Sequence, residues 1–166
     1  CLSNNVPLSN SSTIQSGTLG FEWNWGNGQT SLGANPVYKF PTSGTYSVTL
    51  KAISSFGCVD SMVRAVTVND RPFAGFTVAN ACKDDQVAFT NTTTFSGGAQ
   101  NVQYSWDFGD NTFSSSATPN KVFVATGSRT VVLKAVDALN GCRDSVSKVV
   151  TINYKPVATF SATPEA

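Results

Sequence analysis

Trp106-Asp107-Phe108-Gly109-Asp110 is the stretch that decides the fold, because a weaker copy of it occurs earlier in the chain. The copy is Trp23-Asn24-Trp25-Gly26-Asn27-Gly28, and its first tryptophan lies 83 residues before Trp106. Each stretch has an aromatic residue, a short polar residue, a second aromatic residue and a Gly-Asx pair. This pattern is typical of a buried strand that ends in a tight turn. Its recurrence predicts a tandem repeat.

The repeat extends well beyond these two stretches. Pro36 corresponds to Pro119, and Gly57-Cys58-Val59-Asp60-Ser61 corresponds to Gly141-Cys142-Arg143-Asp144-Ser145. A period above about 80 residues is too long for a solenoid unit, which has roughly 20–50 residues, but it suits a whole small domain. We therefore predict two domains, over residues 1–70 and 71–154.

The phase of the repeat predicts the start of a third domain. Arg71-Pro72-Phe73-Ala74-Gly75-Phe76 opens the second repeat, and Lys155-Pro156-Val157-Ala158-Thr159-Phe160 matches it near the end of the chain. Residues 155–166 are thus predicted to be the opening strand of a third repeat, and the first repeat begins without such a strand. One hypothesis follows: strand 156–162 of one molecule completes the first repeat of another, head to tail.

Composition narrows the functional classes. Charged residues make up 13% of the chain, the net charge is +1 and no basic stripe is present, so we expect no nucleic-acid partner. No run of 18 apolar residues occurs, so we expect no membrane insertion. Histidine is absent, and the chain has no Gly-x-Ser-x-Gly elbow, phosphate loop or Cys-His pair. We predict a secreted or cell-surface protein that is not an enzyme.

Alternation of polar and apolar residues predicts antiparallel strands throughout. Residues 45–52 and 129–136 alternate with a period of two. Further strands are expected near residues 20–26, 59–69, 73–79, 86–92, 102–109, 143–153 and 156–162. Turn signals such as Gly97-Gly98 separate them. The predicted fold class is all-β, with two tandem immunoglobulin-like β-sandwiches in a rod-like arrangement, joined by short linkers that contain proline.

Aromatic residues supply both the expected cores and the candidate ligand-binding residues. Trp23 and Trp106 are expected at the centres of the two cores. Trp25, two residues after Trp23, is expected to point away from the core or toward a loop, as is Phe108. Trp25 is therefore a candidate for stacking on sugars, and so are Phe56 and Phe113, which are expected in loops, where binding residues often lie. The alternative is that these side chains pack in the core or at its rim.

The four cysteines occupy equivalent places, two in each repeat. Small secreted domains often stabilise thin cores with disulfides. The sequence therefore predicts disulfides Cys1–Cys58 and Cys82–Cys142. Four free buried thiols and a crossed Cys58–Cys82 bridge remain alternatives at this stage, whereas the absence of Cys-x-x-Cys spacing disfavours a zinc site.

Together the motifs resemble those of the polycystic-kidney-disease (PKD) domain family. The family has a Trp-Asp-Phe-Gly-Asp-Gly strand, then a Pro-x-x-x-aromatic segment, then Gly-x-Tyr-x-Val-x-Leu, which residues 44–50 and 127–133 resemble. The departures are Asn24 and Asn27 for the two aspartates, Asn111 for the last glycine and Arg129 for the tyrosine. The resemblance implies immunoglobulin-like sandwiches with non-catalytic roles in spacing, adhesion, or polysaccharide or protein binding.

The cysteine-containing motifs resemble a subgroup of this family. A cysteine before the second strand, with Gly-Cys-x-Asp-Ser later, is similar to repeats of large surface proteins that gliding bacteria export by the type IX secretion route. This implies a stiff, disulfide-stapled spacer that forms or displays an adhesin, with adjacent repeats and polysaccharide or surface glycoprotein as partners. The alternative is a polysaccharide- or protein-binding accessory module of a secreted hydrolase.

Two further kinds of site have competing interpretations. Asp107 and Asp110 are weak candidates for calcium, but aspartates at these positions also cap turns, and the asparagines of the first repeat favour the capping role. We therefore predict no cofactor and no metal. Ser61 and Ser145 follow aspartate in an Asp-Ser-apolar pattern and are candidate O-glycosylation sites. The alternative is a strand start at which Asp and Ser cap backbone groups.

Overall fold

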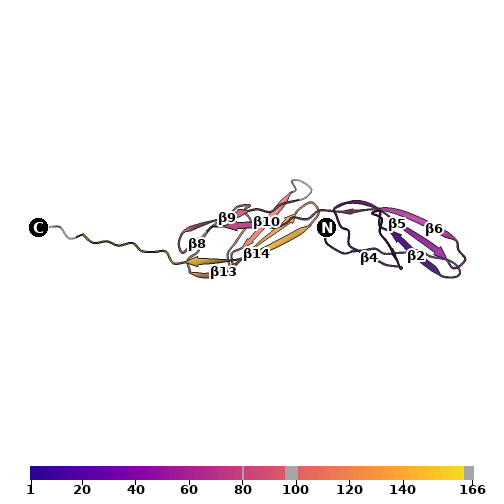
Figure 1. Cartoon of the computed structure of the whole chain (residues 1–166), viewed down its shortest axis with the longest axis horizontal. Helices are drawn as coiled ribbons and strands as arrows, with labels where there is room; N and C mark the ends of the chain where they lie inside the picture. Colours follow the sequence, from indigo (N-terminus) through magenta and orange to yellow (C-terminus); the bar gives the residue numbers. More distant parts are fainter. Residues whose placement is uncertain (80, 96–100, 163–166) are drawn as a thin grey trace. The chain divides into compact units, whose positions relative to one another are not determined.

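The computed structural model describes residues 1–79, 81–95 and 101–162 (Figure 1). These residues form strands, turns and loops, which confirms the predicted all-β fold. None of them forms a helix long and apolar enough to cross a membrane. The chain divides into two compact units, Cys1–Arg71 (unit 1) and Pro72–Ala166 (unit 2). The turn predicted at Gly97-Gly98 lies outside the described residues.

Unit 1 contains a four-stranded antiparallel sheet and a two-stranded sheet. The larger has the order β3-β2-β5-β6 and the smaller pairs β1 with β4. The strands are β1 (Val6–Pro7), β2 (Leu19–Asn24), β3 (Thr30–Leu32), β4 (Val37–Tyr38), β5 (Gly44–Ser54) and β6 (Val59–Val68).

Unit 2 contains larger versions of the same two sheets. One has the order β11-β10-β13-β14-β8, in which β8 alone runs parallel to its neighbour, and the other has the order β12-β9-β7. The strands are β7 (Phe76–Val78), β8 (Ala81–Cys82), β9 (Gln86–Asn91), β10 (Val102–Asp107), β11 (Phe113–Ser114), β12 (Asn120–Val122), β13 (Gly127–Asp137) and β14 (Arg143–Asn153).

The register places matching apolar rows across both larger sheets. In unit 2, Trp106 pairs with Leu133, which pairs with Val146. Paired residues of adjacent strands point to the same face of a sheet, so this row lies against the smaller sheet. The equivalent row of unit 1 is Trp23, Leu50 and Met62.

Aromatic rings from the smaller sheet cover Trp106 in unit 2. The ring centroid of Phe76 lies 5.2 Å and that of Phe89 5.6 Å from the centroid of Trp106, both edge-on. All three side chains are buried. Edge-to-face contacts of this kind add about 0.5–1.5 kcal/mol each to the gain from burial. Trp106 is therefore the centre of its core, as predicted.

The prediction that Trp25 and Phe108 point away from the core or toward a loop is wrong. Trp25 is fully buried and Phe108 is 2% exposed. Residues two apart in a strand point to the same face, so period two itself places Trp25 on the side of Trp23 and Phe108 on the side of Trp106, and the ends of β2 at Asn24 and of β10 at Asp107 do not reverse this. Each ring then stacks on the neighbouring tryptophan, with centroids 6.1 Å apart in unit 1 and 6.4 Å apart in unit 2.

The glycine after each of these aromatics permits the turn. Gly26 has φ +74° and Gly109 has φ +73°, in the left-handed region that favours glycine. A Cβ on Gly26 would lie 2.7 Å from the carbonyl oxygen of Ser47, and one on Gly109 would lie 2.7 Å from that of Thr130. Both the backbone conformation and the close approach to β5 or β13 therefore require glycine.

Residues 156–162 do not form the strand that the repeat phase predicts for them. They lie outside any strand, and Val157 and Phe160 are 87% and 94% exposed. A strand needs a neighbour that accepts its backbone hydrogen bonds, and this segment pairs with none of the described strands. Its role as the opening of a third repeat stays a prediction, and residues 163–166 lie outside the described residues.

The cysteines also differ from the predicted pairing. Cys1 and Cys142 are disulfide-bonded, whereas Cys58 and Cys82 are free. Neither Cys1–Cys58 nor Cys82–Cys142 is therefore formed.

The physical reason is that the two cysteines of each unit lie at opposite ends of its sandwich. Cys58 directly precedes β6, while Leu2, next to Cys1, donates its N–H to Asn69 O beyond the other end of that strand. In unit 2, Cys142 directly precedes β14, and Cys82 pairs with Asn153 at its far end. Ten or eleven residues of strand span roughly 33–36 Å, far beyond the ~7 Å limit for the Cα atoms of a disulfide.

We predict that Gly109→Ala lowers the free energy of unfolding of unit 2 by about 2–4 kcal/mol, from the left-handed conformation and the clash with Thr130 together. The measurement is hydrogen-exchange mass spectrometry of unit 2 peptides in a urea series. Gly141→Ala is the matched control, because Gly141 has φ +71° but open space around it, so it should lose only about 1 kcal/mol. Equal losses would show that the close approach to β13 is unimportant.

Candidate functional site

In the Gly-Asx turn of unit 2, both aspartates accept hydrogen bonds from backbone N–H groups of the turn itself. Asp107 Oδ1 accepts a hydrogen bond from the N–H of Gly109 at 2.9 Å, and Asp110 Oδ1 accepts one from the N–H of Thr112 at 3.2 Å. These are the bonds of an Asx turn, in which a short polar side chain closes the bend.

Unit 1 makes the same bonds with neutral amides. Asn24 Oδ1 accepts from the N–H of Gly26 at 2.9 Å, and Asn27 Oδ1 accepts from the N–H of Gln29 at 3.2 Å. An amide oxygen thus suffices at both positions. Within residues 1–79, 81–95 and 101–162, no group of three or more His, Cys, Asp or Glu side chains could hold a metal ion. Asp107 and Asp110 thus have a structural role in their turn, and the asparagine amides fill the same role in unit 1.

Asp110 also forms a half-buried ion pair. Its Oδ2 lies 2.9 Å from Lys121 Nζ, and the lysine ammonium lies 5.7 Å from the ring centroid of Phe108 and 5.5 Å from that of Phe123. Burial opposes ionisation of Asp110, but the hydrogen bonds from Lys121 and Thr112 and the charge of Lys121 outweigh it, so the pKa of this carboxyl lies below its ordinary value.

Unit 1 fills the same place without charge. Asn27 replaces Asp110 and Tyr38 replaces Lys121, and Asn27 Nδ2 donates to the Tyr38 hydroxyl at 2.9 Å. The Tyr38 ring stacks on Trp25 with centroids 4.2 Å apart and planes 7° apart. Both units thus join the turn to the opposite sheet at this point, one by an ion pair over aromatic rings and the other by a hydrogen bond and a stack.

We predict that Asp110→Asn lowers the free energy of unfolding of unit 2 by about 1 kcal/mol at neutral pH, because the amide keeps the turn bond but loses the ion pair. Because the pKa of Asp110 in the folded protein lies below its unfolded value near 3.8, the ionised carboxylate stabilises the fold above that pH. This stabilisation is lost as the pH falls through the lower, folded-state pKa. The variant should therefore lose less stability than the wild type on acidification below about pH 4.

The measurement is urea unfolding at a series of pH values between 2 and 7. Hydrogen exchange of unit 2 peptides is the readout. Asp107→Asn is the matched control, since it makes the same chemical change next to the same turn without touching the ion pair. An Asp110→Asn variant with the pH profile of the wild type would contradict the assigned role of Lys121.

The three candidate sugar-binding aromatic residues differ in their exposure to solvent. The prediction that Trp25 is an accessible ligand-binding side chain is wrong, because Trp25 is fully buried and its ring stacks on that of Tyr38. Phe56, in the turn between β5 and β6, is 74% exposed, and Phe113, in β11, is 68% exposed. These two side chains are accessible to a ligand, and binding by either stays a prediction.

Ser61 and Ser145 lie on the surface within the long strands β6 and β14. Both are exposed. Asp60 Oδ1 accepts the N–H of Ser61 at 2.9 Å, so the aspartate next to the candidate serine does bind backbone there. Modification of either serine stays a prediction.

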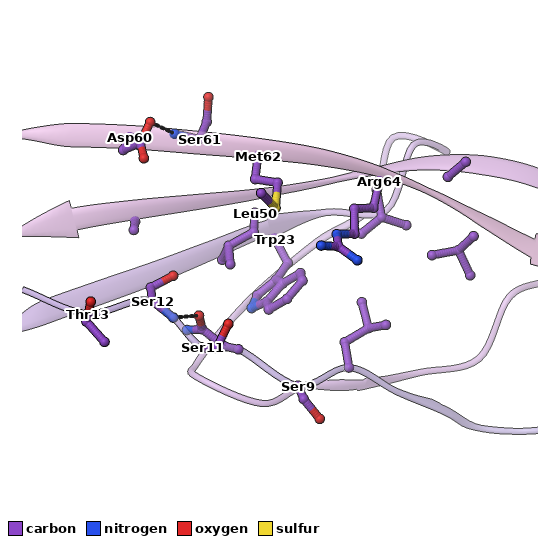
Figure 2. Close-up of a pocket in the computed structure, with 16 residues that line it drawn as sticks. Ser9, Ser11, Ser12, Thr13, Trp23, Leu50, Asp60, Ser61, Met62 and Arg64 are labelled. Carbon is purple, nitrogen blue, oxygen red and sulfur yellow. Dashed lines mark hydrogen bonds between the residues drawn. The ribbon is translucent and has the colours of Figure 1, made fainter.

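Unit 1 also contains a groove, a candidate site that none of the sequence motifs marks. It has a volume of about 610 Å³ and lies between the inner face of the β2-β5-β6 sheet and the segment 8–13. Figure 2 shows Trp23 in its interior, with Leu50 and Met62 on the sheet side and Ser9, Ser11 and Ser12 on the opposite side. Leu50 is only half-buried and Met62 is 57% exposed, although both point inward.

The equivalent space in unit 2 is filled by residues 73–78. Phe76 is 1% exposed and covers Trp106. The N–H of Ala74 donates to Asp144 Oδ2 at 3.0 Å, and Lys148 Nζ donates to the carbonyl oxygen of Phe76 and lies 5.2 Å from its ring centroid. The inward side chains of β14 thus hold this segment on one side.

The strand β9 holds it on the other side. Phe76 pairs with Asn91, and Phe73 forms a two-bond bridge with Thr94 farther along the chain. The counterparts on β6 in unit 1 are Asp60, which corresponds to Asp144, and Arg64, which corresponds to Lys148. Both side chains line the groove and are exposed.

A family model described as "PKD domain" matches residues 2–68 and residues 69–153. The chain belongs to the PKD domain family. The two PKD repeats so defined correspond to unit 1 and unit 2, and the resemblance found from the motifs is confirmed.

Solved PKD domains are similar to this chain. The PKD1 domain of Vibrio anguillarum Epp is 24% identical with a TM-score of 0.48, and the match covers 53% of this chain and 100% of that chain. The PKD1 domain of the Vibrio cholerae metalloprotease PrtV is 28% identical with a TM-score of 0.45, covering 50% and 98%. A structure of carbohydrate-binding modules from the β-sandwich superfamily is 25% identical with a TM-score of 0.48, covering 52% and 36%.

Proposed function

We propose that this chain is a non-catalytic structural segment of a large secreted cell-surface protein, a stiff spacer that forms or displays an adhesin. The observation that carries the proposal is the tandem of two PKD repeats in which the polar side chains of the turn, Asn24 in one and Asp107 in the other, accept hydrogen bonds from their own backbone. Groups used in this way hold a fold together and are not free to act on a substrate.

The cysteines support an extracellular location. Cys1 and Cys142 are disulfide-bonded, and disulfides persist in oxidising compartments outside the cytosol. The surface is rich in Ser, Thr and Asn with few charges, which is common in secreted β-proteins. Proline at position 72 restricts the linker between the two repeats, which supports the idea of a stiff spacer.

The Gly-Cys-x-Asp-Ser sequences support a more specific origin. They occur at Gly57 and Gly141 and resemble repeats of surface proteins that the type IX route exports in gliding bacteria. In such a protein the partners would be adjacent repeats of the same chain, and polysaccharide or surface glycoprotein.

One observation favours a second candidate function, an accessory module of a secreted hydrolase that binds polysaccharide or protein. Phe56 and Phe113 expose most of their rings, and each belongs to a turn or a short strand at the surface. Exposed aromatic faces of this kind can stack on sugars. In this case the catalytic domain would lie outside these residues.

We predict that the chain shows no specific binding to an array of polysaccharides and surface glycoproteins, as expected of a spacer. The array is probed with the wild type, with Phe56→Ala and Phe113→Ala, and with Leu139→Ala as the control, because Leu139 is a similarly exposed (75%) but non-aromatic side chain in a hairpin turn. Specific binding that is lost in either phenylalanine variant and kept in Leu139→Ala would overturn the spacer proposal and support the binding module.

A further inference from the structure

The sequence contains two Asn-Gly pairs, Asn27-Gly28 in unit 1 and Asn140-Gly141 in unit 2. In such a pair the backbone nitrogen of glycine can attack the side-chain amide carbon of asparagine, because glycine has no Cβ that hinders the approach. Whether a folded protein permits this attack depends on whether the glycine N–H is free and on the charges around the amide. The two pairs differ in both respects.

Asn27 and Gly28 lie in the turn that follows β2. Gly28 is exposed and has φ +84°, and a Cβ built on it would meet nothing within 4 Å. Among the residues that the structure describes, no group accepts a hydrogen bond from the N–H of Gly28. The nitrogen is therefore open to a solvent base that removes its proton, and there is open space beside Gly28 for a ring to form.

The side-chain amide of Asn27 is held by neutral groups. Its Oδ1 accepts the N–H of Gln29 at 3.2 Å, and its Nδ2 donates to the Tyr38 hydroxyl at 2.9 Å. When the glycine nitrogen adds to the amide carbon, negative charge develops on Oδ1, and a backbone N–H that already points at this oxygen stabilises that charge. Residues 23–29 include no acidic side chain that would oppose it.

Asn140 and Gly141 lie in the hairpin turn between β13 and β14, and their surroundings are different. The N–H of Gly141 donates to Asp137 O at 2.8 Å. Asn140 Nδ2 donates to Asp137 Oδ2 at 2.7 Å, and Asp137 is 1% exposed. Asn140 Oδ1 accepts a backbone N–H here too, that of Cys142 at 2.8 Å. The glycine nitrogen is thus engaged, and a buried carboxylate next to the amide opposes a second negative charge.

We propose that Asn27 is a site of spontaneous modification in the folded protein and that Asn140 is protected from it. The nitrogen of Gly28 loses its proton to a solvent base and forms a bond to Cγ of Asn27. The bond from Cγ to Nδ2 breaks, and Nδ2 takes a proton from solvent and leaves as ammonia. The product is a cyclic succinimide. Water then adds to either carbonyl carbon of the ring and opens it, which gives aspartate or isoaspartate at position 27.

The two products have different consequences for the turn. Aspartate at position 27 reproduces the turn of unit 2, in which Asp110 Oδ1 accepts the N–H of Thr112 at 3.2 Å. Isoaspartate instead routes the backbone through the former side chain and so lengthens it by one atom. Across this turn the N–H of Trp25 donates to Gln29 O at 3.0 Å, and a longer loop displaces that pair. Isoaspartate therefore loosens the turn that follows the buried Trp25.

The first test follows both pairs in one sample. The folded chain is incubated in mildly alkaline buffer, and peptide mapping by mass spectrometry measures the conversion of each asparagine over time. Asn27 should convert at least tenfold faster than Asn140. In urea, where the chain is unfolded, the two rates should become similar, because the dipeptides are identical. Equal rates in the folded chain, faster conversion of Asn140, or conversion of Asn27 only in urea overturns the proposal.

A variant of the glycine tests its role as the attacking group. Gly28→Asn introduces the residue that unit 2 has at this place, Asn111, which adopts φ +63° there, so the turn should be kept. Conversion of Asn27 should fall at least tenfold, because a side chain now shields the backbone nitrogen. Gly141→Asn is the matched control and should leave conversion of Asn27 unchanged. Unchanged conversion in Gly28→Asn would contradict attack by the Gly28 nitrogen.

The last test separates the two products. Hydrogen exchange of peptides that contain residues 19–25 should be severalfold faster in the aged chain, in the fraction that carries isoaspartate, than in fresh protein. Asn27→Asp contains only the ordinary aspartate and should exchange like fresh wild type at these residues. Equal exchange in the isoaspartate fraction and in Asn27→Asp would overturn the assigned loosening of the turn.

Discussion

A thin β-sandwich has to cover the indole ring at its centre from both layers, and the rest of each repeat depends on how this is achieved. In unit 2 the adjacent strands β10 and β13 present Trp106 and Leu133, while Phe76 and Phe89 cover the indole from the smaller sheet. Without residues 73–78 the tryptophan would border a groove, which is the situation of Trp23 in unit 1. The opening strand is therefore part of the core of its repeat.

The two units reach the same architecture with different chemistry at the turn after the central strand. Gly26 and Gly109 are required in both, because a Cβ would meet the adjacent strand. The connection to the opposite sheet is freer. The pair Asp110 and Lys121 in unit 2 is replaced by Asn27 and Tyr38 in unit 1, which avoids the cost of removing charges from water. Geometry is thus fixed at this turn, whereas charge is not.

Much of this fold could be predicted from the sequence, because period-two alternation and a repeat of 83 residues are both visible there. The central tryptophans and long strands follow directly. The burial of Trp25 is consistent with the same alternation, since residues two apart in a strand point to one face and Trp25 lies two residues after the buried Trp23. The predicted pairing of the cysteines is wrong, because their spacing in the sequence does not reveal that Cys58 and Cys1 lie at opposite ends of a ten-residue strand. The groove was signalled only indirectly, by the phase of the repeat.

The central claim, that an opening strand completes the core of each repeat, can be measured directly by placing residues 71–81 ahead of Cys1. If the claim holds, the free energy of unfolding of unit 1 rises by about 2 kcal/mol or more, as expected for burying one phenylalanine, and the same extension with Phe76→Ala gives little of that gain. Hydrogen exchange of unit 1 peptides in urea reports the change. An unchanged free energy of unfolding, or an equal gain with alanine, would contradict the account.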